Sequence, residues 1–353
     1  MAYTTINKSS EYFDTLLWTG DNSSTKNITG LNFQPDLSFK KERNAAFSIG
    51  NMWYDSVRGL GQDKHLNSAS TAVEGSGNDD LYGYYTGFIS GGFSVTAGSS
   101  GSDYVNNSSY NYVAWNWKAN GAGVTNTAGT ISSTVSANPT SGFSIVSYTS
   151  PNSSSDQTVG HGLGVTPSFI ITKNLDNAFN WDIHHKSLSS GNGLLFTTDV
   201  PRAGVFGSMT STTFGTKTSY THNSTHRYIA YCFAEVKGFS KFGSYVGNGS
   251  TDGTFIYTGF KPAFVIVKAS STAGQWSICD NRRGTANTAN GEFLFAEIPD
   301  ALNAAVNNWD FVSNGFKARA NYAAHNTSGV TYVYMAFAEQ TLVGTNNVPA
   351  TAR

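Results

Sequence analysis

The adjacent histidines are the residues of this sequence best suited to binding a metal ion. His184 and His185 stand side by side in the stretch "NWDIHHKS", and His184 comes two residues after Asp182. In an extended strand, residues two apart point to the same face, so Asp182 and His184 could bind one ion together. A complete metal site needs further ligands, and no Cys or His motif with metal-binding spacing supplies them. We therefore expect no metal site, and a structural role for the pair.

Two glutamates could support the cleavage of glycosidic bonds, which requires two carboxyl groups facing each other at a fixed separation. Glu235 and Glu339 end two similar stretches, "YIAYCFAE" and "YVYMAFAE". A third stretch of this kind, "YVAWNWKA", ends with Ala119, and no second recurrent carboxylate accompanies the glutamates. The sequence also lacks the nucleophile elbow, the phosphate-binding loop and the dinucleotide-binding fingerprint. We predict a protein without catalytic residues and without a cofactor, and thus not an enzyme.

Aromatic and paired charged side chains are the remaining candidates for a binding surface. Exposed rings can stack on the faces of sugars, whereas the recurrent Trp181 and Trp276 are more typical of a core. The candidates for contact with a glycan or a partner protein are Trp53, Tyr84, Tyr85 and Trp309. Two equivalent stretches, "DSVRG" and "DNRRG", each place an aspartate before an arginine at the same spacing. The expected ion pairs, within a turn or between subunits, are Asp55 with Arg58 and Asp280 with Arg283.

The composition indicates an all-β protein. Charged residues form 13% of the 353 residues, aromatic residues form 14%, and the chain contains 37 glycines. Small uncharged polar residues together with aromatic residues are typical of strands joined by tight turns. The net charge of −1 provides no basic surface, so we expect no nucleic-acid partner. We also expect no insertion into a membrane, because no run of about 18 apolar residues occurs.

Three copies of one pattern run through the chain. The phrases "GLNFQPDLSFKK" (30–41), "GLGVTPSFIITK" (162–173) and "YTGFKPAFVIVK" (257–268) each place a lysine at the same distance after a proline. Further on, Trp181 and Trp276 each follow their proline by fourteen residues (181 − 167 and 276 − 262). Each copy ends with one of the aromatic stretches quoted above, and in "YIAYCFAE" both alternating faces are largely apolar. This indicates a strand covered on both sides, or one at a junction between domains.

Each copy contains about seven short apolar runs separated by Gly, Asn or Ser clusters, which is typical of an antiparallel β-sandwich. We predict three tandem sandwiches of jelly-roll or lectin-like type, end to end along the chain, with at most one short helix, at 298–309. The predicted boundaries are 1–120 (copy 1), 121–142 (a linker), 143–236 (copy 2) and 237–340 (copy 3). An extended tail at 341–353 lies outside the repeat, and its candidate docking residues are Val343, Val348, Pro349 and Arg353.

Several stretches of the sequence are similar to one group of proteins. They are the opening "MAYTTINKSSEYFDTLLWTG", the repeated proline phrase, the stretch "AYCFAEVKGFSKFGSY" and the ending "VGTNNVPATAR". On these stretches the chain resembles, over nearly its whole length, virion structural or fibre proteins of marine tailed phages, including phages of cyanobacteria. The resemblance implies a component of the phage particle that is assembled in the cytoplasm of the host bacterium. It supplies no catalytic residues.

From the resemblance we expect a tail fibre, a spike or a capsid-decorating appendage. Phage appendages are often threefold, so we expect a homotrimer that contacts other virion proteins of the capsid or the tail. Two alternatives stay open. The chain could be a carbohydrate-binding module that recognises glycans on the host surface through exposed Trp and Tyr rings. Ranked third is a depolymerase of capsular polysaccharide that uses Glu235 or Glu339.

Overall fold

The fold is almost entirely β. The computed structural model describes residues 4–44, 50–218, 225–284, 287, 293–300 and 309–340. Nearly all of its elements are strands of antiparallel sheets, which confirms the predicted all-β class. Two short helical elements lie in copy 1, a 3₁₀ turn at Ser9–Glu11 and a four-residue helix, α1 (Asp79–Tyr82). Most of the helix expected at 298–309 lies outside the described residues.

Copy 1 consists of a larger and a smaller antiparallel sheet. The larger sheet has five strands, in the order β1 (Phe13–Thr19), β8 (Asn111–Trp117), β3 (Leu37–Glu42), β4 (Met52–Asp55) and β5 (Leu66–Asn67). The smaller sheet has three strands, in the order β2 (Thr25–Thr29), β7 (Gly92–Thr96) and β6 (Tyr84–Ile89). The two sheets enclose a core of their own, which includes Trp18, Tyr54 and Phe93.

Copy 2 repeats this plan with two additional strands. Its larger sheet has seven strands, in the order β15 (Leu194–Leu195), β14 (Asp182–His185), β13 (Phe169–Asn174), β18 (Arg227–Phe233), β11 (Phe143–Thr149), β10 (Ser133–Asn138) and β9 (Val124–Asn126). Its smaller sheet has the order β12 (Gln157–Gly160), β17 (Thr213–Thr216) and β16 (Phe206–Met209). Tyr148, Val159 and Phe214 lie in the core between the two sheets.

Copy 3 has the same strand order as copy 1. Its larger sheet has the order β19 (Ser240–Val246), β26 (Thr331–Ala338), β21 (Pro262–Ala269), β22 (Trp276–Asp280) and β23 (Leu294–Phe295). Its smaller sheet has the order β20 (Phe255–Tyr257), β25 (Gly315–Ala318) and β24 (Trp309–Val312). Tyr245, Ile256 and Phe316 belong to its internal core.

The segment 121–142, which we expected to be a linker, contributes strands β9 and β10 to copy 2. Strand β10 pairs with β11 along its length, so that Val135 lies opposite Val146. Val135 and Ile131 are buried in the core of copy 2, which explains why the segment joins the sheet. The segment therefore extends copy 2 instead of merely connecting it to copy 1.

Equivalent positions in the three copies can be identified from the strand registers. In each copy an aromatic ring of β1, β11 or β19 stacks on a tyrosine of the closing strand, which is β8, β18 or β26. The stacked pairs are Trp18 with Tyr112 at 5.0 Å, Tyr148 with Tyr228 at 5.3 Å and Tyr245 with Tyr332 at 5.2 Å between ring centroids. These pairs also lie directly opposite each other in the antiparallel ladders. The sequence repeat is thus also a structural repeat.

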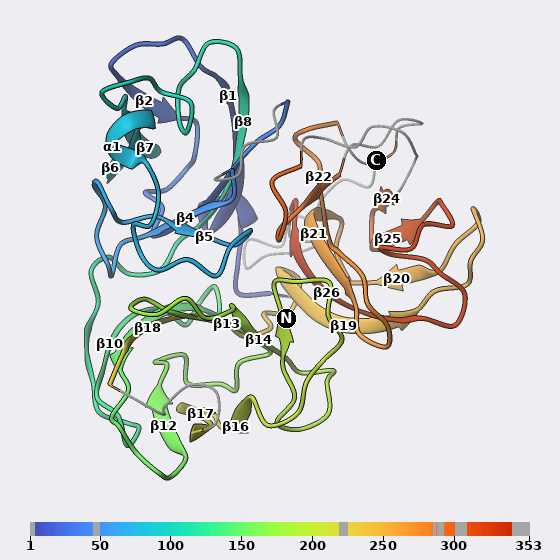
Figure 1. Ribbon diagram of the computed structural model, residues 1–353. Coiled ribbons are helices and arrows are strands. Elements are labelled where there is room, and N and C mark those ends of the chain that lie inside the picture. The colour runs from blue at the N-terminus through green and yellow to red at the C-terminus, as the bar shows by residue number, and fades with distance from the viewer. Residues whose placement is uncertain are drawn as a thin grey trace.

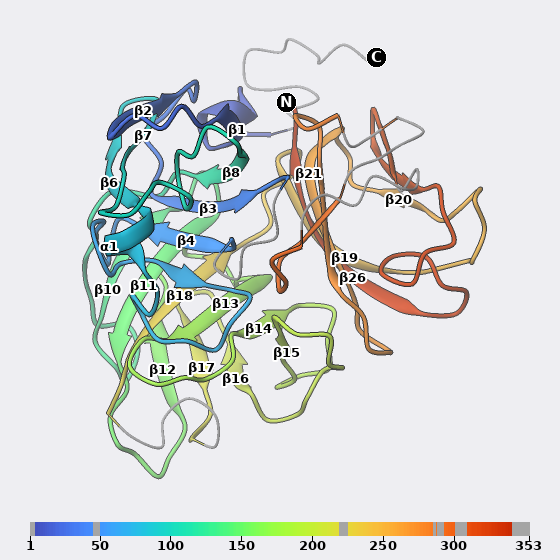
Figure 2. The same cartoon turned by 45° about the horizontal axis from the view of Figure 1, so that its top comes forward.

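The three copies surround a common centre (Figures 1 and 2). Copy 1 is drawn in blue to cyan, copy 2 in green and copy 3 in orange to red, and each has its larger sheet turned towards the other two. The inward faces of the larger sheets form one hydrophobic cluster with residues from every copy, among them Trp115, Tyr231 and Met335. The larger sheets are therefore covered on both faces, as the apolar alternation of "YIAYCFAE" indicates. The copies are consecutive in the sequence, and in space they close into a ring.

Candidate functional site

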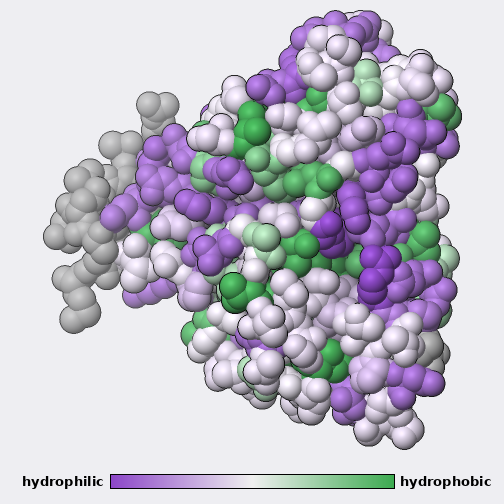
Figure 3. Space-filling model, turned by 90° about the vertical axis from the view of Figure 1, so that its left-hand side faces the viewer, coloured by the Kyte–Doolittle hydropathy of each residue, from purple (hydrophilic) through white to green (hydrophobic). Residues whose placement is uncertain are grey.

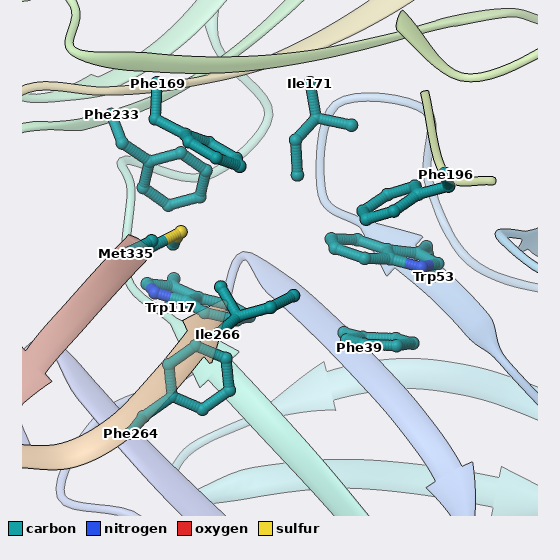
Figure 4. Close-up of a pocket in the computed structure, with 10 residues that line it drawn as sticks. All are labelled: Phe39, Trp53, Trp117, Phe169, Ile171, Phe196, Phe233, Phe264, Ile266 and Met335. Atoms are coloured by element: carbon teal, nitrogen blue, oxygen red, sulfur yellow. The ribbon is translucent and has the colours of Figure 1, made fainter. Parts of the chain in front are cut away.

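The centre of the ring contains a small apolar cavity (Figure 4). Its volume is about 20 Å³, and its lining comes from all three copies, for example Trp53, Phe169 and Phe264. Apart from the indole nitrogens of Trp53 and Trp117, every side-chain atom drawn around the cavity is carbon or sulfur. A cavity of this size holds at most about one water molecule, and an apolar cavity stays dry. The centre of the molecule is therefore a packing core and not a ligand site.

Buried lysines of the repeated proline phrase join neighbouring copies. Each of these side chains donates a hydrogen bond through Nζ to a backbone carbonyl of another copy. The bonds run from Lys173 to Thr71 (2.8 Å), from Lys268 to Thr198 (3.1 Å) and from Lys41 to Ile298 (2.7 Å). Copy 2 thus reaches copy 1, copy 3 reaches copy 2, and copy 1 reaches copy 3. One type of contact, used three times, closes the ring.

Burial affects the charge of these lysines. It lowers the pKa of Lys41 to about 7 and the pKa values of Lys173 and Lys268 to about 8. The carbonyl groups that accept the hydrogen bonds offset part of the cost of burying an ammonium group. The lysines therefore act as donors in the interior of the protein.

A second ring of hydrogen bonds starts from the residue opposite each lysine on the next strand. Lys268 pairs with Trp276 in the ladder, and the same register leads to Trp181 in copy 2 and Asn51 in copy 1. Each of these side chains donates to a backbone carbonyl of another copy. The carbonyl belongs to the short edge strand of that copy's larger sheet or to the residue that follows this strand. The bonds are Trp181 Nε1 to Asn67 (3.1 Å), Trp276 Nε1 to Leu195 (2.7 Å) and Asn51 Nδ2 to Ala296 (2.8 Å). An amide in copy 1 thus replaces the indole of the other two copies.

The ion pairs expected from the sequence lie at the contacts between copies. Arg58 Nε is 2.5 Å from Asp55 Oδ2, and Arg283 Nε is 2.6 Å from Asp280 Oδ2. All four side chains are buried, and each aspartate also accepts backbone N–H groups of its own turn. The pairs therefore hold the turn that follows β4 or β22.

Each aspartate of these ion pairs also accepts a hydrogen bond from another copy. Tyr231 Oη of copy 2 donates to Asp55, and Trp115 Nε1 of copy 1 donates to Asp280, both at 2.9 Å. In copy 2 the equivalent position is His185, whose Nε2 donates to the carbonyl of Tyr334 in copy 3 at 3.0 Å. In copy 3, Met335 stands at the position from which Trp115 and Tyr231 donate in the other copies, and a methionine side chain cannot donate. Its neighbour in copy 2 is therefore a histidine that donates a hydrogen bond, in place of an aspartate that accepts one.

Three of the four aromatic residues proposed to contact a glycan or a partner are buried. Trp53 is 3% exposed, Tyr85 0% and Trp309 1%, so these side chains cannot bind a ligand from solvent. Trp53 stacks on Phe39 in the shared core, and Tyr85 stacks on Tyr54 inside copy 1. Their strand positions face inwards, which explains the burial. Tyr84, which points the other way from Tyr85, is partly exposed.

Three other aromatic side chains, which the sequence did not single out, are exposed. Phe255 and Tyr257 on β20 are 46% and 60% exposed, and Phe179 in copy 2 is 44% exposed. The signal was present in the stretch "TFIYTG", where Phe255 and Tyr257 flank the core residue Ile256. Alternation along a strand places two such flanking residues on the opposite face from the core. On the face formed by copies 1 and 2, green hydrophobic residues lie scattered among pale and purple ones (Figure 3).

The histidine pair has no metal-binding geometry. Asp182 forms an ion pair with Arg202 at 2.7 Å, and burial raises the pKa of Asp182 to about 6. Burial lowers the pKa values of His184 and His185 to about 4, so both imidazoles are neutral at neutral pH. Among the described residues, no group of three or more His, Cys, Asp or Glu side chains could hold a metal ion.

The glutamates considered for catalysis are bound to lysines. Burial raises the pKa of Glu235, but hydrogen bonds from Lys186 and Lys241 outweigh this effect and hold the pKa below its usual value. Glu339 forms an ion pair with Lys261 at 2.8 Å. A general acid of a glycosidase needs a raised pKa, so Glu235 is unsuited to that role.

The remaining observations concern thiols, membranes and the tail. Cys232 and Cys279 are both buried, and neither is part of a disulfide. In the described part of the chain, no helix is both long and apolar enough to cross a membrane. The candidate docking residues of the tail, Val343, Val348, Pro349 and Arg353, lie outside the described residues.

Comparison with known proteins identifies one family. Residues 8–341 match a family described as a domain of unknown function (DUF7483). No curated protein and no solved structure matches the chain. The matched range covers all three copies, so the unit that defines the family is the whole ring and not a single sandwich. This chain belongs to the DUF7483 family.

Proposed function

We propose that the protein is a non-enzymatic structural component of a bacteriophage particle, namely a tail fibre, a spike or a capsid-decorating appendage. The observation that carries the proposal is the closed ring of three sandwiches around one apolar core. Such a body is rigid, because each copy is held by buried hydrogen bonds to both of the others. The resemblance of the sequence to marine phage virion proteins supplies the biological setting.

The chemistry of the described residues supports a structural role over a catalytic one. The recurrent charged groups, Asp55 with Arg58 and Asp280 with Arg283, are used in contacts between copies. Glu235 and Glu339 each pair with lysine and belong to different strand ends, so a depolymerase has no support from a facing carboxylate pair. Charged residues form only 13% of the chain, which suits a protein that packs against other subunits through uncharged contacts.

Two assembly states are compatible with a phage appendage. The sequence led us to expect a homotrimer, and closed symmetric assemblies are the rule for soluble oligomers. The internal ring, however, already provides a threefold arrangement within one chain, so one chain could occupy a threefold position by itself. Light scattering after size-exclusion chromatography distinguishes the two: a mass of three chains supports the homotrimer, and a mass of one chain supports the single-chain state.

The direct test of the proposed function is the location of the chain. Purified particles of the phage that encodes it should contain the protein at a fixed ratio to the major capsid protein, measured by quantitative mass spectrometry. Gold-labelled antibodies against the chain should then decorate the head or the tail in electron micrographs. Absence of the protein from purified particles, with abundant protein in the infected cell, would refute the proposal.

Carbohydrate binding is the second candidate function. It is favoured by one specific observation, the exposed pair Phe255 and Tyr257 on copy 3. A receptor-binding appendage would combine this role with the structural one, since it must be rigid and must also contact the host surface.

A further inference from the structure

We propose that the outer face of the smaller sheet of copy 3 is a carbohydrate-binding site, with Phe255 and Tyr257 as its stacking platform. We call this surface the β20 face. Its members, taken from the strand register, are Phe255, Lys317 and Asp310 in one row and Tyr257, Gly315 and Val312 in the next. This site would perform the second candidate function, carbohydrate binding. The proposal rests on that function, which makes the glycan a polymer of the host surface.

The alternation of β20 separates this face from the core. Ile256 is 5% exposed and packs inside copy 3 with Phe316 and Phe311. Phe255 and Tyr257 point to the opposite side and are about half exposed. Two residues of one strand face are about 7 Å apart along the strand, which is suitable for contacting one or two sugar rings.

The fold itself does not require aromatic residues at these positions. Ile28 in copy 1, Val159 in copy 2 and Ile256 in copy 3 are equivalent, because each lies opposite a core phenylalanine on the next strand. The neighbours of Ile28 are Asn27 and Thr29, and the neighbours of Val159 are Thr158 and Gly160. Two copies thus form the same sheet with small or polar residues where copy 3 has exposed rings. An adjacent exposed aromatic pair without a folding role is a candidate surface for contact with another molecule.

The surroundings of the rings suit a flat ligand. A Cβ atom at Gly315 would lie 3.0 Å from Cε2 of Phe255, so the Phe255 ring leans over the glycine backbone. Phe255 nevertheless remains 46% exposed. Tyr257, beside it, makes no hydrogen bond through its hydroxyl group to any described residue and can therefore bond to a ligand.

Charged groups border the rings and are held in place by one another. Asp252 pairs with Lys317 at 2.5 Å and with Arg319 at 3.5 Å, and Arg319 pairs with Asp310 at 3.2 Å. The donors and acceptors of this network that are not used within it can bond to hydroxyl groups. An apolar ring surface beside fixed polar groups matches a sugar, which has an apolar C–H face and a polar rim of hydroxyls.

A protein partner fits this face less well. A stable protein interface covers roughly 800 Å² on each partner and has a core depleted of charge. The β20 face has six residues, and two of the three residues in its first row, Lys317 and Asp310, are charged. Its size and mixed character are those of a small-ligand or glycan site.

The test is affinity electrophoresis of the whole chain in gels containing soluble polysaccharide. The probes are galactomannan, xylan and protease-treated surface polysaccharide extracted from the host bacterium. We expect retardation by at least one probe and a loss of affinity of about tenfold or more in the variant Phe255→Asn/Tyr257→Thr. This variant carries the residues that copy 1 has at the same positions, so its sheet should remain folded.

The matched control is Phe179→Asn, which removes an exposed ring from copy 2 and should leave retardation unchanged. Thermal melting of each variant checks that it is folded. No retardation of the original chain by any probe would overturn the proposal. Equal loss in the Phe179→Asn variant, or unchanged binding of the double variant, would overturn it as well. The assay uses the isolated protein, so its failure is separate from failure to find the chain in phage particles.

Discussion

The inner and outer surfaces of the three copies differ in how freely their residues vary. At the contacts between copies, the same bond recurs although the residues change, as when Asn51 replaces the indole of Trp181 or Trp276. On the outer faces of the smaller sheets, equivalent positions hold Asn27, Thr158 and Phe255, which share no interaction. The ring contacts therefore restrict the chemistry of the inner positions, whereas the outer positions are free to acquire separate functions.

The largest expected effect on stability comes from removing one aspartate that lies at a contact between two copies. Asp280→Ala leaves Arg283 buried without its partner and Trp115 without an acceptor. Breaking one partner of a buried ion pair typically costs about 3–5 kcal/mol, and we expect a loss of that size in urea unfolding. The control is Asp252→Ala, which removes an exposed ion pair of copy 3 and should change stability little. Equal effects of the two substitutions would contradict the difference between inner and outer surfaces.

Acidification should weaken the contact between copies 2 and 3. Burial lowers the pKa of His185 to about 4, from a usual value of 6.5. The unfolded chain therefore binds the proton first, and the stability present above pH 6.5 is lost as the pH falls towards 4. The loss at this position amounts to up to about 3 kcal/mol.

Other groups titrate in the same range, since burial raises the pKa of Glu297 to about 7 and of Asp182 to about 6. Comparison with His185→Gln isolates the histidine, because these carboxyl groups are present in both proteins. We expect the original chain to have the larger free energy of unfolding at neutral pH, and the difference between the two proteins to decrease as the pH falls. A difference that is independent of pH would show that His185 does not titrate on unfolding.

A smaller effect is expected when one hydrogen bond between copies is removed and the packing is retained. Trp276→Phe keeps an aromatic ring in the core but leaves the carbonyl of Leu195 without its donor. An unsatisfied buried carbonyl costs about 1–2 kcal/mol. The equivalent Trp181→Phe should lose a similar amount, because its bond to Asn67 occupies the same place in the ring. Chemical denaturation of both variants measures this, and a loss confined to one of them would break the equivalence.

The smallest effect on stability is expected on the outer surface. Phe255→Asn/Tyr257→Thr should change the unfolding free energy by less than about 0.5 kcal/mol, because surface substitutions without buried contacts rarely do more. The same denaturation experiment measures it. A large loss of stability would mean that the two aromatic side chains support the fold. The conclusion that copy 3 does not need them, drawn from copies 1 and 2, would then be wrong.

The repeat and the β-class could be predicted from the sequence because they depend on local pattern. Alternating residues predict strands, and the recurring prolines and lysines identified the copies before their contacts were known. Lys41, Lys173 and Lys268 stood out by spacing alone, but their carbonyl partners are distant in sequence. Closure of the ring depends on such long-range contacts, which no local pattern encodes.

The candidate site was predicted less well, and for a physical reason. Tryptophan and tyrosine rings were the expected contacts with a glycan, yet Trp53, Tyr85 and Trp309 occupy inward strand positions and are buried. Phe255 and Tyr257 could have been found by comparing the three copies position by position, since only copy 3 has rings on both sides of the core residue. Exposure follows from the face of the strand more than from the type of ring.

The central claim is that the three copies form one body around a shared core. Differential scanning calorimetry of the whole chain tests it most directly. The account predicts one transition whose calorimetric and van't Hoff enthalpies agree, because no copy can keep its larger sheet covered without the other two. Two or three separate transitions, each with the enthalpy expected for a single sandwich, would contradict it.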